Sequence, residues 1–139
     1  MQTFLPYPDF SKSAHCLDMK RLGKQRVEVL QILKSLKEGG GWQNHPAVKM
    51  WKGYEEALVL YGEVICDVWT EKGYKDTCLD KIYKIVGVSG LMLPRFLPPW
   101  LGNKNFHRSH KSNLLRKDPE FYGKYGWDVP ADLPYVWPV

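Results

Sequence analysis

Four polar side chains recur at helical spacing near the start of the chain, within the stretch DMKRLGKQRVE at residues 18–28. In order, they are Asp18, Arg21, Gln25 and Glu28. Steps of three and four residues place them on one helix face, where acidic and basic groups share a surface. Such a surface suits proton transfer, but it equally suits a ladder of ion pairs, Asp18 with Arg21 and Lys24 with Glu28. Each such pair contributes only about 0.2–0.5 kcal/mol, and the spacing alone favours the ladder.

A second group of polar side chains lies in FHRSHKSNLLRKDPEFYGKYGW, residues 106–127. Its cationic, imidazole and hydroxyl groups suit phosphates, and they belong to His107, His110, Lys111, Ser112, Arg116 and Lys117. The aromatic residues that follow suit stacking on bases, and they are Phe121, Tyr122, Tyr125 and Trp127. A basic helix whose aromatic residues close the core is the alternative. The two histidines lie one turn apart without an accompanying acid or cysteine cluster, so no metal site is expected.

The charge balance points to a polyanionic partner. The formal net charge is +5 and the isoelectric point about 9.1, and residues 104–117 hold five cationic side chains without an acid. No apolar run approaches the roughly 20 residues of a membrane helix, and the N-terminus lacks the pattern of an export signal. Three cysteines without a CxxC spacing predict buried free thiols. A cytoplasmic location is expected.

The hydrophobic pattern predicts one all-α domain over residues 1–139, with three to four helices, long irregular loops and an extended N-terminal arm. The first helix is expected from a cap at Ser11 or Ser13 to Leu36, and the second from a cap at Asn44 or His45 to Gly73. A short third helix spans 76–86, a loop spans 87–105, and a fourth helix spans 107–117. Gly23 lies within the first helix, where it costs about 1 kcal/mol against alanine, which predicts close packing or a ligand approach.

Four stretches together resemble a known family. The chain enters LDMKRLGKQRVE from its arm, continues in HPAVKMWKGYEEALVLYGEVICDVWTEKGY, and later carries FHRSHKSNLLRKDP and EFYGKYGW. In order and spacing these stretches resemble the small pyrimidine-dimer DNA glycosylases with abasic-site lyase activity. The resemblance includes a long helix that starts at a histidine and ends in a basic-Gly-aromatic triplet, here residues 72–74, and an aromatic tail, here FYGKYG.

The resemblance implies a compact bundle of three main helices whose N-terminus threads between them to the active site. It implies that an α-amine attacks C1′ of the damaged nucleotide and forms an imine, while a carboxylate of the first helix assists. The imine then allows β-elimination of the 3′ phosphate. An α-amine suits this role because it titrates near 7.7–8, against about 10.4 for lysine, and so keeps a neutral fraction at physiological pH.

Some site residues of the family have a counterpart in this sequence and others do not. Arg26 with Val27 matches an Arg-Val pair, and Arg21 lies close to an arginine that contacts phosphates. The assisting glutamate of the family falls at Gly23, so Glu28, one turn later, or Asp18, one turn earlier, must take its place. Glu28 is preferred because it lies next to Arg26 and on the polar stripe, which is the helix face that carries Asp18, Arg21, Gln25 and Glu28. Met1 would supply the amine, because the bulky Gln2 should block removal of the initiator.

The sequence therefore predicts a DNA repair glycosylase and abasic-site lyase that acts on damaged duplex DNA, with pyrimidine dimers as the expected lesion. Met1, Glu28 and Asp18 are the candidate catalytic residues. The candidate DNA-binding residues are Arg21, Lys24, Gln25, Arg26, His45, His107, His110, Lys111, Arg116 and Lys117, with Trp51 beside the site. No metal or cofactor is expected, and the protein should be a monomer associated with the nucleoid. A non-catalytic nucleic-acid-binding module of this fold, or a glycosylase for another modified base, remains open.

Overall fold

A computed structural model describes residues 1–88, 90 and 93–139. Within these residues it contains only helices and irregular segments, so the all-α prediction is confirmed. The predicted count of three to four helices is too low. The elements are α1 (Phe10–Cys16), α2 (Met19–Glu38), α3 (Pro46–Lys49), α4 (Glu55–Glu71), α5 (Cys78–Val86), α6 (Lys104–Lys117), α7 (Pro119–Tyr122) and the short 3-10 helix η1 (Gly123–Tyr125). No described helix is long and apolar enough to cross a bilayer.

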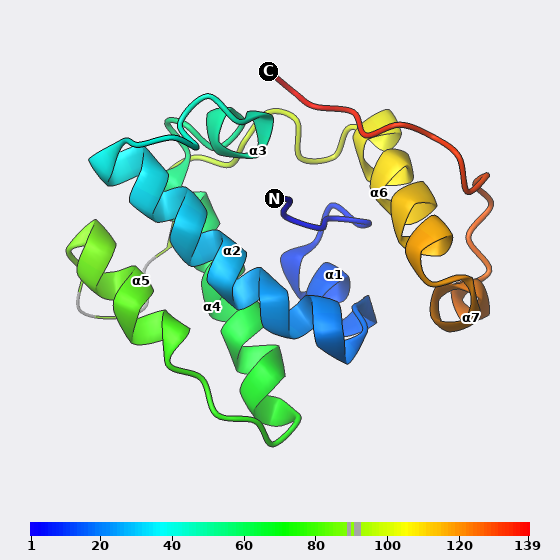
Figure 1. The fold of residues 1–139 in the computed structure, drawn as a ribbon, viewed down its shortest axis with the longest axis horizontal. Helices are drawn as coiled ribbons and strands as arrows, with labels where there is room; N and C mark the ends of the chain where they lie inside the picture. The colour runs from blue at the N-terminus through cyan, green and yellow to red at the C-terminus, as the bar shows by residue number, and fades with distance from the viewer. Residues whose placement is uncertain (89, 91–92) are drawn as a thin grey trace.

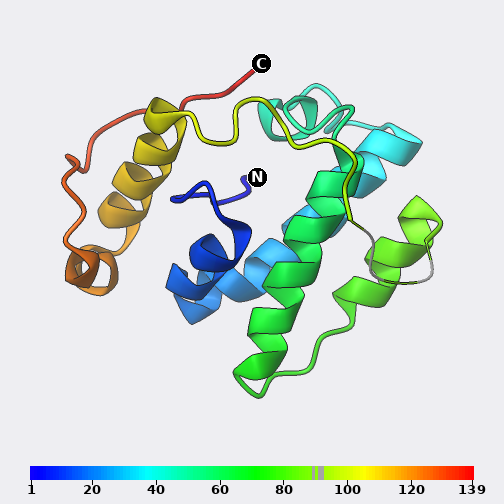
Figure 2. The ribbon, with the colours of Figure 1, turned by 180° about the vertical axis from the view of Figure 1, so that it is seen from behind.

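The helices form two groups around the start of the chain. Helix α2 packs against α4 and α5, and α1 packs against α4, whereas α6 lies on the other side of the molecule with α7 (Figure 1). The N-terminus lies between the two groups in both views, and the C-terminal tail returns along α6 toward α3 (Figures 1 and 2). The fold therefore brings the first residues of the chain next to α2, α6 and the tail.

The single helix expected from residue 14 to residue 36 is interrupted. Leu17 and Asp18 have extended backbones, with ψ of 142° and 158°, and separate α1 from α2. The cap of α1 is Asp9, whose side chain accepts from the Lys12 N–H at 2.8 Å, rather than Ser11 or Ser13. Asp18 precedes α2 without capping it, because its carboxylate accepts hydrogen bonds from Tyr122 and Arg21 instead.

The second expected helix is also divided, here at Gly53. This residue has φ of +87°, a conformation that side chains disfavour, and it lies between α3 and α4. The expected cap is present, because Nδ1 of His45 accepts from the Ala47 N–H at 3.0 Å. Helix α6 begins three residues before its expected start, because the Asn103 side chain caps it. The expected loop over 87–105 includes residues 89, 91 and 92, which lie outside the described part of the chain.

A core of aliphatic and aromatic side chains holds the first group of helices together, with Trp51, Tyr61 and Leu22 fully buried. All three cysteines are buried and free, as expected. Burial raises the pKa of the Cys16 thiol to about 12, so this thiol is unreactive at neutral pH. The cysteines therefore belong to the core.

Gly23 makes a close packing contact, which is one of the two alternatives that its position predicts. A Cβ there would lie 2.9 Å from the ring of Trp69, so α2 and α4 approach each other closely at this point. Gly62 of α4 plays a similar part against α2 and α5, where a Cβ would lie 2.9 Å from Cγ1 of Val29 and 3.2 Å from Cδ1 of Ile82. Both neighbours are fully buried and have little room to move.

Gly62→Ala is therefore expected to destabilise the protein. Overpacking costs about 1–3 kcal/mol, which outweighs the gain of up to about 1 kcal/mol in helix propensity. Urea unfolding should show a net loss of about 1–2 kcal/mol in the free energy of unfolding. Gly123→Ala is the matched control: a Cβ there meets nothing within 4 Å and φ is −61°, so stability should be unchanged or higher. Equal effects of the two substitutions would contradict the close approach.

Candidate active site

The first residues of the chain are fixed to α2 by the side chain of Gln25. Its Oε1 accepts from the Phe4 N–H at 2.9 Å, and its Nε2 donates to the Gln2 carbonyl at 2.8 Å. The hydroxyl of Tyr61 donates to the same Oε1 at 2.7 Å and fixes the orientation of the amide. Gln25 was expected to contact DNA, but it is only 1% exposed and binds the backbone of the N-terminal segment instead.

The carboxylate of Glu28 lies next to the start of the chain. Its Oε2 accepts from Nε2 of Gln25 at 2.7 Å and lies 3.4 Å from the backbone nitrogen of Gln2, its second donor. Glu28 is 7% exposed, so few water molecules compete for this carboxylate. The residue therefore lies beside the peptide bond that joins Met1 to Gln2. The expected ladder forms only in part: Arg21 binds Asp18 at 3.1 Å, whereas Glu28 binds the N-terminal segment.

Two histidines of α6 hold the same segment from the opposite side. The Leu5 N–H donates to Nδ1 of His110 at 2.9 Å, and Nδ1 of His107 donates to the Leu5 carbonyl at 2.7 Å. Trp51 also donates its indole N–H to the Thr3 hydroxyl at 3.0 Å. His107 is 5% exposed and His110 is fully buried. Neither imidazole is therefore accessible to a phosphate, although the sequence suggests that role for both. Because the two histidines lie one helical turn apart, both can bind the backbone of the same residue, Leu5.

His110 makes stability depend on pH. Burial, with a smaller contribution from His107, lowers its pKa to about 3, against about 6.5 in an unfolded chain. Below pH 6.5 the unfolded state binds the proton and the folded state does not, so stability falls as the pH falls. His110→Asn keeps an acceptor for Leu5 and does not titrate. Urea unfolding between pH 6 and 4 should show a slope about 1.4 kcal/mol per pH unit shallower in this variant. Parallel profiles would contradict the assignment.

His45 is partly exposed at the start of α3. Partial burial lowers its pKa, and the positive charge of the chain's N-terminus lowers it further. Its Nδ1 accepts from Ala47, which places the remaining ring proton of the neutral form on Nε2. The ring contacts Trp42 on one side and Trp137 of the tail on another, at centroid distances of 5.9 and 5.8 Å.

Tyr135 of the tail packs against His110 of α6, with ring centroids 5.6 Å apart. Burial raises the pKa of its hydroxyl to about 12; the guanidinium groups of Arg116 and Arg21 oppose this rise, and Glu28 adds to it. These three charged side chains come from α2 and α6, so both helices present charge to the same tyrosine. Arg116 is exposed and Arg21 is partly exposed, so both retain surface for an anion.

Two of the remaining expected cations, Arg26 and Lys111, are already engaged. Arg26 binds Asp76 at 2.6 Å and lies 4.5 Å from the ring centre of Trp69, on the side of α5. Lys111 lies over Tyr7, at 4.9 Å from the ring centre. Lys24 and Lys117 are exposed, and no ion pair or hydrogen bond ties either side chain within the described residues.

Asp18, the other candidate carboxylate, is engaged elsewhere. It accepts hydrogen bonds from the Tyr122 hydroxyl and from Arg21. Burial alone would raise the pKa of this carboxyl, but the two donors outweigh it and lower the pKa, which keeps the group ionised. Asp18 therefore ties α2 to α7, whereas Glu28 is the carboxylate that contacts the start of the chain.

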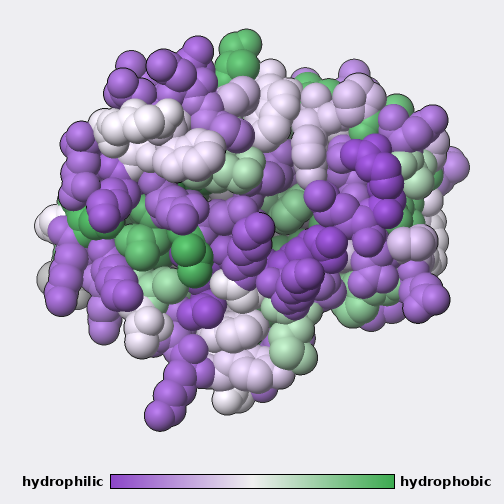
Figure 3. All heavy atoms as spheres, in the orientation of Figure 1, coloured by the Kyte–Doolittle hydropathy of each residue, from purple (hydrophilic) through white to green (hydrophobic). Residues whose placement is uncertain are grey.

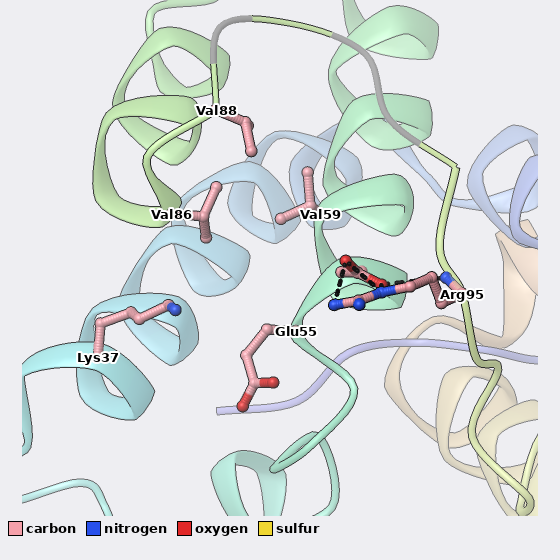
Figure 4. A pocket seen from close by; sticks show the side chains of 7 residues that line it. Lys37, Glu55, Val59, Val86, Val88 and Arg95 are labelled. Atoms are coloured by element: carbon pink, nitrogen blue, oxygen red, sulfur yellow. Dashed lines mark hydrogen bonds and ion pairs between the residues drawn. The ribbon is translucent and has the colours of Figure 1, made fainter.

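A separate cavity of about 260 Å³ lies near the C-terminal ends of α2 and α5, with Glu56 and Arg95 paired at its edge (Figure 4). The other side chains that line it are Lys37, Glu55, Val59, Val86 and Val88. None of them is a predicted site residue. Within residues 1–88, 90 and 93–139, no group of three His, Cys, Asp or Glu side chains gathers as metal ligands would.

Several residues of the site are absent from the sequence-based prediction. Gln2 and Thr3 bind through backbone or hydroxyl groups, which leave no signature in a sequence. Tyr61 sits in an apolar helical pattern that looks like core. Tyr135 and Trp137 lie in a proline-rich tail whose path over the site no local pattern specifies. The density of aromatic residues in that tail is the one signal that points to them.

One of three comparisons with known proteins found a match. Residues 1–82 of the 139-residue chain match the family described as pyrimidine dimer DNA glycosylase. This segment contains α1 to α4 and with them Met1, Gln25, Glu28 and His45. No curated protein and no solved structure matches the chain. The match spans more than half of the sequence, and the chain therefore belongs to the pyrimidine dimer DNA glycosylase family.

Proposed function

We propose that the protein removes a damaged pyrimidine from duplex DNA and then cleaves the strand, with the α-amine of Met1 as nucleophile. The observation that carries this proposal is the contact between Glu28 and the backbone nitrogen of Gln2, at 3.4 Å in a nearly dry setting. This carboxylate holds Gln25 and the Gln2 N–H, and its place at the chain's start also suits a group that moves protons for the amine of Met1.

The proposed reaction makes and breaks bonds at C1′ in two stages. The neutral amine of Met1 attacks C1′, the glycosidic bond breaks, and the base leaves with the bonding electron pair and one of the two amine protons. The nitrogen lone pair then expels O4′: the C1′–O4′ bond breaks, O4′ takes a proton from the medium, and the opened sugar carries a protonated imine. Removal of a proton from C2′ then expels the 3′ phosphate, and water releases the amine.

Glu28 is proposed to assist in three ways at this position. As a carboxylate it stabilises positive charge that develops on the sugar, it accepts the proton that the amine loses, and it orients the first peptide bond. Gln25 and Tyr61 fix the position of Glu28 relative to the N-terminal segment. The nucleophile therefore needs little reorganisation before it attacks. Asp18 is proposed as a positioning residue through Tyr122 and Arg21.

Four cations are proposed to hold the DNA backbone: the exposed Lys24, Arg116 and Lys117, and the partly exposed Arg21. Lys24→Ala should flatten the salt dependence of DNA binding by about 0.9 in the slope of log K against log salt, without loss of stability. Arg26→Ala is the contrast. It leaves the buried carboxylate of Asp76 without its cation and should destabilise the fold by about 3 kcal/mol. A full change of slope with Arg26→Ala and none with Lys24→Ala would reverse the two assignments.

Three duplexes test the proposed function against its alternatives. One carries a pyrimidine dimer, one an abasic site and one an oxidised base, each labelled at the 5′ end. Cleavage of the first two, with a product that ends in the unsaturated sugar of β-elimination, supports the proposal. Cleavage of the oxidised-base duplex but not of the dimer would indicate another damaged base. Binding to all three duplexes without cleavage would indicate a non-catalytic module.

A further inference from the structure

A groove lies between α2 and α5, on the side of α2 that faces away from the N-terminal segment. Its volume is about 310 Å³, and two apolar and four charged side chains line it: Leu30, Lys34, Glu38, Lys81, Lys84 and Ile85. At about 100° per residue, Leu30 lies about 160° and Lys34 about 120° around the helix from Glu28, which contacts the start of the chain. The groove is therefore separate from the candidate active site.

The floor of the groove is apolar and partly open to solvent. Leu30 and Ile85 pack against the core on one side and are only partly buried. Val27, one turn before Leu30 on α2, is 41% exposed and extends this apolar surface. Figure 3 shows a green area bordered by purple side chains over α2 and α5, which Figure 1 labels. Exposed apolar surface with a polar rim is a feature of interaction sites.

The charged rim of the groove has an excess of positive charge. Three lysines and one glutamate line the groove, which gives a net charge of +2. Lys34, Lys81 and Lys84 are exposed, and within the described residues no ion pair or hydrogen bond engages their ammonium groups. Unpaired ammonium groups above an apolar floor fit a ligand that carries carboxylates next to an apolar side chain.

We propose that the groove between α2 and α5 binds an acidic segment of a partner protein, with one or two apolar side chains of that segment on its floor. Its volume is near the lower end of the roughly 300–1,000 Å³ of small-ligand pockets, so no larger group of side chains enters. DNA fits less well, because phosphates leave Leu30 and Ile85 without an apolar partner. A partner bound here leaves the N-terminal segment free for DNA.

Fluorescence anisotropy with three labelled peptides tests this proposal on the intact protein. The first peptide holds four aspartates beside a leucine and a phenylalanine. The second has serine in place of both apolar residues, and the third has asparagine in place of every aspartate. The first should bind at least about 10-fold more tightly than either of the others, because charge and apolar burial both contribute. Equal binding of the first and second peptides, or no binding of the first, would overturn the proposal.

Two charge reversals in the rim locate the binding site. Lys34→Glu and Lys81→Glu should each weaken binding of the first peptide by at least about 5-fold at low salt. Lys72→Glu is the matched control, because it makes the same charge change on an exposed lysine at the end of α4. Its affinity should be that of the wild type. Equal losses in all three variants would mean that net charge alone attracts the peptide, and the groove would be the wrong site.

The Lys81→Glu variant also distinguishes two other occupants. If the groove held DNA, this variant should flatten the salt dependence of duplex binding by about 0.9 or more in slope, whereas a protein-binding groove leaves the slope unchanged. If the groove held a second copy of the chain, the wild type should sediment as a dimer and the variant as a monomer. Either result would overturn the proposal. None of these measurements needs an imine or strand cleavage, so their outcome is independent of the proposed function.

Discussion

Glu28→Gln should slow base excision by at least about 100-fold while DNA affinity stays within about twofold of wild type. The amide has nearly the shape of the carboxylate and can still accept from Gln25 and from the Gln2 N–H, so the N-terminal segment keeps its place. It can neither accept the proton of the amine nor stabilise a cationic sugar. Single-turnover excision assays on a dimer duplex, with binding measured in parallel, separate these two effects.

Glu38→Gln is the matched control, since it removes the same charge from the exposed C-terminal end of α2. Its excision rate should be unchanged. Asp18→Asn tests the other candidate carboxylate and should lower stability through the loss of its pair with Arg21, while excision remains within about 10-fold of wild type. An Asp18 variant that loses excision when the Glu28 variant keeps it would exchange their roles. A Glu28 variant that merely unfolds would mark the residue as structural.

One extra glycine before Met1 should abolish imine formation. The added residue displaces the α-amine by up to about 3.3–3.6 Å, and misplacement of about 1 Å at a reacting centre already costs about 100-fold. Residues 2–5 keep their hydrogen bonds to Gln25, Glu28 and the two α6 histidines, so stability should stay near that of wild type. Lyase assays on an abasic duplex, with thermal unfolding as the folding check, measure both consequences.

A one-glycine extension after Val139 serves as control, because that residue is 70% exposed and the added mass is the same. It should cleave abasic DNA at the wild-type rate. If the N-terminal extension were as active as the C-terminal one, the nucleophile would have to be a lysine or water, and the Met1 proposal would be wrong.

The helical class could be predicted from hydrophobic spacing, but the division of the helices could not. Leu17 and Asp18 fit a continuous helical pattern, and the break between them comes from hydrogen bonds with Tyr122, more than 100 residues later. At Gly53 the signal was present, since glycine tolerates positive φ, yet many glycines within helices do not end them. Tertiary contacts therefore set the boundaries that local propensity leaves open.

The polar stripe of α2 was visible from sequence, and its purpose was not. Spacing puts Gln25 and Glu28 on one face, but only the fold reveals that the N-terminal segment lies against that face. The same segment accounts for the burial of His107 and His110, which the sequence pattern assigns to phosphate binding. Backbone groups of residues 2–5 are their partners, and no pattern of side chains encodes such a contact.

Borohydride trapping followed by peptide mass spectrometry tests the proposed chemistry most directly. The protein is incubated with an abasic duplex and sodium borohydride, digested, and the peptide that carries the sugar adduct is identified. The proposal predicts an adduct on the α-amine of Met1, formed by wild type and absent after the N-terminal extension. An adduct on a lysine side chain, or strand cleavage without any trapped protein, would contradict it.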